Sequence, residues 1–148
     1  MLIREVMTES VVTAEAAASV LEVAELMRER NVGSVVLLEG SRPVAFLTDR
    51  DIAVSVVADG RSGSDRARDH ASAPVITGRS EMDVEEAAAL MVEHGIRRLP
   101  VLDGDRLTGI VTLNDLAVRL GDLTLAHRIA SEVIRAAMPE FYFHRRDD

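Results

Sequence analysis

The sequence contains no cysteine, which excludes disulfide bonds, thiolate catalysis and cysteine-ligated zinc. Lysine is also absent, so all 17 basic residues are arginines. Aromatic residues make up only 3% of the 148 residues, whereas hydrophobic residues make up 47%. The core must therefore be aliphatic, and the chain has enough apolar residues to form one.

Long apolar runs are missing as well. No run approaches the roughly 18 residues of a membrane span, and no signal-peptide core follows Arg4 and Glu5. The formal net charge of −8 argues against nucleic-acid binding by general electrostatics. We therefore expect a cytoplasmic protein without a membrane or nucleic-acid partner, although arginines can still form a local anion-binding pocket.

The sequence is organised around a short motif in which a strand leads through a polar turn into a helix. An apolar run ends at Leu47, and a helical pattern begins at Asp51. Such a turn offers free backbone N–H groups to an anion, while Thr48 adds a hydroxyl and Asp51 a carboxylate. The arrangement returns sixty-four residues later at Thr112 and Asp115. Each motif also fits a helix capping box, a role compatible with ligand binding.

Helix caps and turns repeat at the same spacing, without an insertion. Ser19 and Glu22 form a capping box, and Asp83 and Glu86 form its counterpart. The helices that follow are expected to end at Asn31 and Gly95. Further equivalent pairs are Thr13 and Thr77, Leu26 and Leu90, Met27 and Met91, Gly40 and Gly104, and Arg42 and Arg106. This agreement indicates an internal duplication.

Each repeat is predicted to be a β-α-β-β-α unit of the α/β (α+β) class. We place repeat 1 at residues 1–60 and repeat 2 at 61–120, with a polar, glycine-rich linker at 59–65. A unit of about 60 residues cannot bury both faces of a three-stranded sheet alone, so two units are expected to pack sheet against sheet. The expected strands are 11–13, 34–38, 43–47, 74–77, 99–102 and 107–111, and the second helix of repeat 1 is expected at 51–58.

The last part of the chain, 121–148, lies outside the repeats. Residues 122–138 have the pattern of an amphipathic helix, which Pro139 ends. Phe141, Tyr142 and Phe143 follow and are unlike the polar surface expected elsewhere. They either dock onto the same chain or pack across a homodimer.

Two tandem units with Thr-x-x-Asp after an apolar strand resemble a stand-alone pair of cystathionine-β-synthase (CBS) domains, also called a Bateman module. The stretches 6–13, 95–101 and 107–112 are similar to family signatures. The resemblance implies a regulatory, non-catalytic module that binds AMP, ADP, ATP, NAD or S-adenosylmethionine in clefts between the repeats. It also implies a homodimer that signals to an unknown protein, with the adenosyl ligand as effector and no required cofactor.

The resemblance assigns roles to individual residues. Asp51 and Asp115 would accept hydrogen bonds from the ribose hydroxyls, and Thr48 and Thr112 would face the phosphate or ribose. Arginine suits bidentate phosphate contact, and strand alternation predicts that at most one of the two arginines enters a given cleft. The remaining candidates are Arg97 and Arg98 for the phosphate, Val12 and Thr13 or Ile76 and Thr77 for the base, and Ile96 as a further ligand contact.

The two repeats differ at several of these positions. Gly33 and Ser34 replace the arginine pair in repeat 1, where Arg50 is a substitute phosphate partner. Ala45 in repeat 1 corresponds to Gly109 in repeat 2. The two clefts are therefore expected to be inequivalent, with either one or both occupied.

Two other functions compete with this hypothesis. The first is a ligand-free structural or dimerisation adaptor. The second is a small enzyme acting on a nucleotide, which is disfavoured because nothing places Asp51 or Asp115 near a nucleophile. The four histidines have no metal-ligand spacing and are expected at the solvent-exposed surface or at helix ends. We therefore predict no catalytic residue and no metal site.

Overall fold

The computed structural model describes residues 1–73 and 75–120, together with His127 and Ser131. The predicted C-terminal helix and the aromatic cluster lie outside the described residues. The chain divides into two compact units. Unit 1 contains Met1–Thr8, Thr77–Val101 and the described residues from Gly109 onward, and unit 2 contains Glu9–Ile76 and Leu102–Thr108. The structure has a three-stranded sheet for each repeat, as the predicted α+β fold requires.

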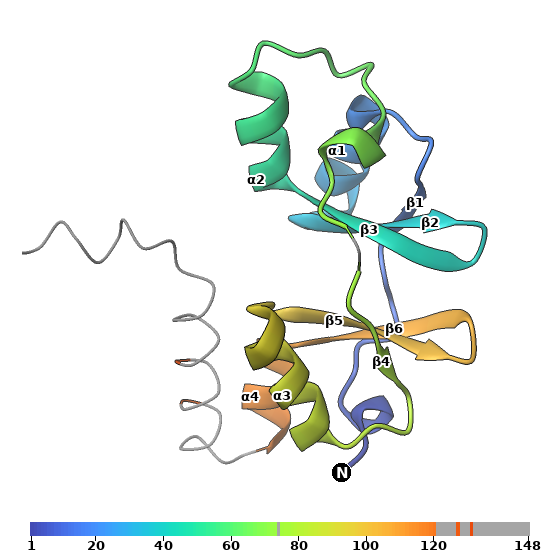
Figure 1. Ribbon diagram of the computed structural model, residues 1–148, viewed down its shortest axis with the longest axis vertical. Coiled ribbons are helices and arrows are strands. Elements are labelled where there is room, and N and C mark those ends of the chain that lie inside the picture. The colour runs from blue at the N-terminus through green and yellow to red at the C-terminus, as the bar shows by residue number, and fades with distance from the viewer. Residues whose placement is uncertain (74, 121–126, 128–130, 132–148) are drawn as a thin grey trace, which may run out of the picture. The chain divides into compact units, whose positions relative to one another are not determined.

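The sheet of the first repeat contains β1 (Thr13–Glu15), β2 (Ser34–Glu39) and β3 (Arg42–Thr48). Strand β1 pairs in parallel with β2, which pairs antiparallel with β3. Gly40 has φ +63° in the tight turn between β2 and β3, a conformation that favours glycine. Figure 1 shows α1 (Val20–Arg30) and α2 (Asp49–Asp51) on the same face of this sheet.

The predicted caps of α1 are confirmed. The backbone N–H of Glu22 donates to the Ser19 hydroxyl at 3.1 Å, and the Glu22 carboxylate accepts the Ser19 N–H at 2.9 Å. At the other end, Asn31 has left-handed geometry with φ 54°. Val23 and Met27 are buried on the inner face of this helix. Local capping and an apolar stripe therefore fix both the ends and the orientation of α1.

The helix predicted at 51–58 is present, but most of it is not a regular α-helix. Helix α2 has only three residues and continues as the π-helix η2 (Ile52–Val57). The Ser55 hydroxyl donates to the Asp51 carbonyl at 2.9 Å, and the segment is rich in β-branched residues. Both features weaken a regular α-helical ladder. Hydrophobic periodicity alone does not reveal this change of helix type.

The predicted linker at 59–65 is held against helix α1. Val20 N–H donates to the Asp65 carbonyl and Leu21 N–H to the Gly63 carbonyl, both at 2.9 Å. These bonds satisfy N–H groups that a helix leaves free at its N-terminus. The 3₁₀ turn η3 (Ala67–His70) follows, and Ala67 is fully buried in the core. The polar segment is therefore part of unit 2. The core cluster of this unit is aliphatic and comprises Ala16, Val23, Met27, Val35, Leu37, Ala45, Leu47 and Ala67.

The second repeat forms corresponding elements. Its sheet has the order β4 (Gly78–Arg79), β5 (Arg98–Asp103), β6 (Arg106–Thr112). Figure 1 shows α3 (Val84–His94) and α4 (Leu113–Leu120) on one face of this sheet. The predicted caps at Asp83 and Gly95 are confirmed, with Gly95 at φ 62°. None of the helices in the described part of the chain is long and apolar enough to cross a membrane.

The first eight residues pack with the second repeat. Ile3 in the 3₁₀ turn η1 (Ile3–Glu5) is fully buried, and its N–H donates to the Met82 carbonyl at 2.9 Å. Thr8 and Ile110 exchange two backbone hydrogen bonds of 2.9 Å. A Cβ at Gly109 would lie 2.6 Å from Sδ of Met7, which explains why this repeat has glycine where the first has Ala45. The predicted boundary between residues 60 and 61 divides the two sequence repeats. Each compact unit of the structure contains segments from both repeats.

Candidate ligand-binding site

The two Thr-x-x-Asp turns have the same local geometry. Asp51 N–H donates to the Thr48 hydroxyl at 3.1 Å, and Thr48 N–H donates to Oδ2 of Asp51 at 2.9 Å. The bonds between Thr112 and Asp115 have the same two lengths. Each turn therefore forms a complete capping box between a strand and a helix.

The capping role uses only one oxygen of each aspartate. Oδ2 accepts the threonine N–H, whereas Oδ1 of Asp51 and of Asp115 has no hydrogen-bond partner within the described ranges. All four side chains of the two turns are half-buried. Each carboxylate therefore retains hydrogen-bond acceptor capacity for a ligand.

A hollow of about 190 Å³ opens beside the second turn, within unit 1. Arg97, Arg98, Thr112, Leu113 and Asn114 line it. A hollow of this size has room for several water molecules, and its two arginines make it suitable for an anion such as phosphate. Strand alternation does not apply to both arginines, because β5 begins only at Arg98 and Arg97 lies in the bend before it.

The first turn makes the same backbone hydrogen bond as the second turn but carries different side chains. Asp49 N–H donates to the Gly33 carbonyl at 3.0 Å, and Leu113 N–H donates to the Arg97 carbonyl at 3.1 Å. A Cβ built on Gly33 would lie 3.1 Å from Oδ2 of Asp49. Where the second turn has arginines and a leucine, the first therefore has small residues and a carboxylate.

The other predicted residues are divided between the units. Val12, Thr13, Arg50 and Ile76 belong to unit 2, whereas Thr77 and Ile96 belong to unit 1. Ile96 N–H donates to the Met91 carbonyl at 3.0 Å and so completes the end of α3. These residues are half-buried, except for the exposed Arg50. Their roles toward a base or a phosphate remain predictions.

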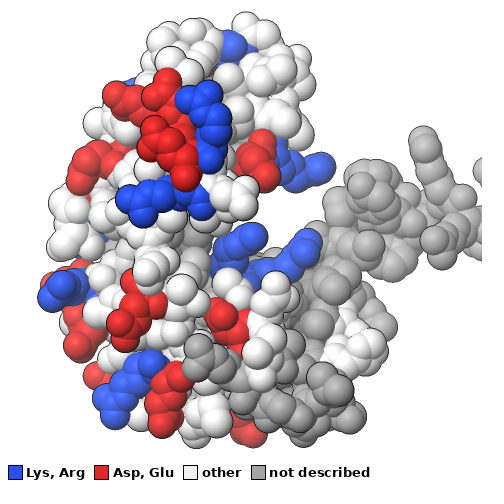
Figure 2. Space-filling model, turned by 180° about the vertical axis from the view of Figure 1, so that it is seen from behind, with Lys and Arg blue, Asp and Glu red and all other residues white. Residues whose placement is uncertain are grey.

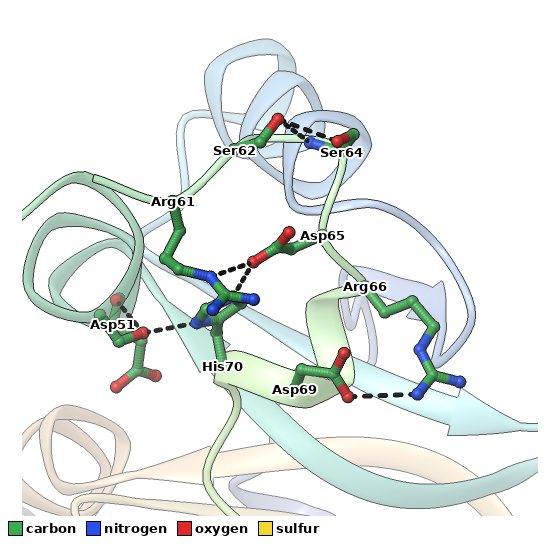
Figure 3. A network of polar contacts seen from close by, with 9 residues as sticks. Asp51, Arg61, Ser62, Ser64, Asp65, Arg66, Asp69 and His70 are labelled. Atoms are coloured by element: carbon green, nitrogen blue, oxygen red, sulfur yellow. Dashed lines mark hydrogen bonds and ion pairs between the residues drawn. The ribbon is translucent and has the colours of Figure 1, made fainter. Parts of the chain in front are cut away.

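A polar network connects the first turn to the segment after η2 (Figure 3). Ser55 Oγ lies 2.9 Å from Nδ1 of His70, and Nε2 of His70 lies 2.9 Å from Oδ2 of Asp65. Arg61 Nε donates to the same oxygen at 2.9 Å. His70 ends η3, as expected for a helix-end histidine, but its side chain is only 9% exposed. Of the two expected settings for a histidine, the solvent-exposed surface or a helix end, His70 therefore has the second.

This network has electrostatic consequences. Hydrogen bonds from His70 and Arg61 lower the pKa of Asp65 below its ordinary value. Ser55 has one hydroxyl hydrogen, which it donates to the Asp51 carbonyl. The same hydroxyl oxygen lies within hydrogen-bond distance of Nδ1 of His70, so the network joins the backbone of the first turn to the 61–70 segment.

Several of these features were not predicted from the sequence. Leu113 and Asn114 line the hollow. Because they lie between Thr112 and Asp115, their place in the motif could have indicated this contact. The contact of Asp49 with Gly33, by contrast, depends on side-chain placement. Groups of three His, Asp or Glu arranged as metal ligands do not occur among the described residues. The face in Figure 2 mixes acidic and basic side chains.

The fold and its repeated turns define a tandem-repeat α+β protein. A family model for the CBS domain matches residues 3–58 and 67–122, and the chain therefore belongs to the CBS-domain family as a pair of repeats. The resemblance derived from the motifs is thus confirmed. The matched family is regulatory in general, and no catalytic family is indicated.

Similar proteins support this assignment. The CBS domain-containing protein YhcV of Bacillus subtilis is 40% identical over 116 residues, which cover 78% of this chain and 83% of YhcV. The CBS domain protein PAE2072 of Pyrobaculum aerophilum, solved in complex with AMP, is 28% identical with a TM-score of 0.75. That similarity covers 86% of this chain and 99% of PAE2072.

Proposed function

We propose that this protein is a cytoplasmic sensor that binds an adenosine-containing ligand at its Thr-x-x-Asp turns and regulates a partner protein. The observation that carries the proposal is the repeated pair of half-buried carboxylates, each with one oxygen lacking a partner in the described chain. The same hydrogen bonds that cap the helices hold these carboxylates in place. The sites are therefore preorganised before a ligand arrives.

The chemistry of a ribose suits these turns. Its two neighbouring hydroxyls are hydrogen-bond donors, and the free carboxylate oxygen of Asp51 or Asp115 is a charged acceptor. Hydrogen bonds to ionised groups are roughly twice as strong as neutral ones. The predicted neighbours of the base are Val12 and Thr13 or Ile76 and Thr77, and Ile96 is a further predicted ligand contact.

AMP is the first ligand to test. The relative PAE2072 was solved with AMP, at 28% identity and over 86% of this chain. The hollow beside Thr112 contains two arginines, whose guanidinium groups match phosphate geometry. ADP, ATP, NAD and S-adenosylmethionine remain candidates, and the ligand serves as an effector.

We further propose that the protein forms a homodimer through exposed apolar residues of η2 and α4, the helical segments that follow the two Thr-x-x-Asp turns. Val54 and Val57 in η2 are 53% and 70% exposed, and Val118 in α4 is 77% exposed. Val54 and Val118 occupy equivalent positions in the two repeats. A second copy would bury the same kind of surface on both repeats, and ligand binding at the adjoining turns would alter that contact.

A thermal-shift screen of AMP, ADP, ATP, NAD and S-adenosylmethionine tests the binding proposal. A ligand at a hundredfold its Kd adds about 2.7 kcal/mol to stability. We expect a shift with at least one ligand that decreases in Asp51→Ala or Asp115→Ala. An absence of any shift, with protein free of co-purified nucleotide, would instead support the ligand-free adaptor.

A further inference from the structure

The two turns share a backbone frame but carry opposite charges around it. The N–H groups of Asp49 and Leu113 make equivalent hydrogen bonds, of 3.0 and 3.1 Å, to the carbonyls of Gly33 and Arg97. The capping boxes next to them are identical in length. The differences between the two turns therefore lie in their side chains rather than in their backbone.

The second turn is basic. Arg97 and Arg98 line the hollow with Thr112, Leu113 and Asn114, and none of these lining residues is acidic. Neither arginine has an ion-pair partner among the described residues. Their charges are therefore available to an anion that enters the hollow.

The first turn places a carboxylate in the corresponding region. Asp49 replaces Leu113, and its Oδ2 lies 3.1 Å from the site where a Cβ of residue 33 would be. Its Oδ1 accepts the backbone N–H of Arg50 at 2.8 Å, which fixes the carboxylate at the start of the turn. Gly33 is what allows the carboxylate to come this close. Any phosphate held by the exposed Arg50 would have this negative charge beside it.

We infer that the turn at Thr112 selects a phosphorylated adenosine ligand, whereas Asp49 makes the turn at Thr48 discriminate against phosphate. This inference rests on the proposed binding of an adenosine ligand at the two turns. A phosphate monoester carries a charge of about −1.5 to −2 at neutral pH, so attraction at one turn and repulsion at the other are both substantial. The turn at Thr48 therefore accepts an uncharged nucleoside or a positively charged adenosyl compound.

Variants that leave one turn intact separate the two sites. Calorimetric titrations with AMP and with adenosine are made on Asp51→Ala, which retains the turn at Thr112, and on Asp115→Ala, which retains the turn at Thr48. We expect AMP to bind about tenfold or more tightly than adenosine to the first variant, and no more tightly than adenosine to the second. The AMP preference should decrease as salt is added, because the arginines are exposed.

A charge-only substitution identifies the residue responsible. Asp49→Asn in the Asp115→Ala background retains an oxygen that can accept the Arg50 N–H, and it should increase AMP affinity about fivefold to tenfold without changing adenosine affinity. The matched change Leu113→Asp, in the Asp51→Ala background, should reduce AMP affinity and spare adenosine.

The outcomes distinguish the two proposals. Equal AMP preference at both turns, or no effect of Asp49→Asn on AMP, would overturn the phosphate inference while leaving nucleoside binding intact. Binding of neither compound to the wild-type protein would overturn the phosphate inference, and binding of none of the adenosyl ligands of the screen would overturn the proposed function as well.

Discussion

Thr48 and Asp51 cap each other: the Asp51 N–H donates to the threonine hydroxyl at 3.1 Å, and the Thr48 N–H donates to the carboxylate at 2.9 Å. The equivalent bonds in the second repeat have equal lengths. These contacts serve two purposes, because they stabilise a helix start and hold the proposed ribose acceptor in position. Their structural part can be measured without any ligand.

We expect Thr112→Val to reduce the free energy of unfolding by about 1 kcal/mol, since the Asp115 N–H loses its acceptor. Thr48→Val should have a similar effect because its geometry is the same. Urea denaturation measures both. Thr112→Ser retains the hydroxyl and is the control. Equal losses for serine and valine would show that the hydroxyl does not act as the cap.

Asp65 should make stability depend on pH. Its pKa is lowered by hydrogen bonds from His70 and Arg61, so the folded state favours the charged carboxylate. The stabilisation is present above the ordinary carboxyl pKa of about 3.9, and it is lost as the pH falls through the lowered pKa of the folded state. Asp65→Asn should therefore be less stable than the wild type at pH 7, with a difference that decreases in acid. A difference that stays constant from pH 7 to pH 2.5 would contradict this role.

A side chain at position 109 should clash with the N-terminal segment. A Cβ there would lie 2.6 Å from Sδ of Met7 and 2.9 Å from the Thr8 carbonyl oxygen. We expect Gly109→Ala to destabilise the protein by about 1–3 kcal/mol in urea denaturation. Met7→Ala should recover part of that loss in the double variant. Additive losses would indicate that Met7 is not the obstacle.

The proposed homodimer predicts a different response at two exposed apolar positions. Val118→Glu should shift the protein toward the monomer in sedimentation velocity, because Val118 is 77% exposed and has an apolar equivalent in the other repeat. Leu21→Glu is the matched control, since Leu21 is exposed but its repeat counterpart is already Glu85. A wild-type protein that is monomeric, or an equal effect of both changes, would contradict an interface at this surface.

The elements that sequence reasoning predicted best are those determined locally. Ser19, Glu22 and Asn31 specify the ends of α1 through their own backbone contacts, and the repeat spacing carries the same information to α3. The Thr-x-x-Asp turns were predicted for the same reason, because the residues of each box are only three positions apart.

The features that were missed depend on contacts between distant residues. His70 is nearly buried because Ser55 and Asp65 bond it from both sides, and a lone histidine in a sequence does not reveal those partners. The π-helix contains a bond from the Ser55 hydroxyl to the Asp51 carbonyl, a contact that weakens a regular α-helical ladder and that hydrophobic periodicity does not reveal. The joint position of Arg97 and Arg98 depends on where β5 begins, a boundary that hydrophobic alternation places only approximately.

The central claim is that the two turns bind an adenosine ligand through Asp51 and Asp115. Its most direct test is a calorimetric titration of nucleotide-free protein with AMP, in the wild type and in the double variant Asp51→Ala/Asp115→Ala. We predict saturable binding to the wild type and none to the double variant, with circular dichroism showing that both are folded. Undiminished binding to a folded double variant, or no binding to the wild type by AMP or any other adenosyl ligand of the screen, would contradict the claim.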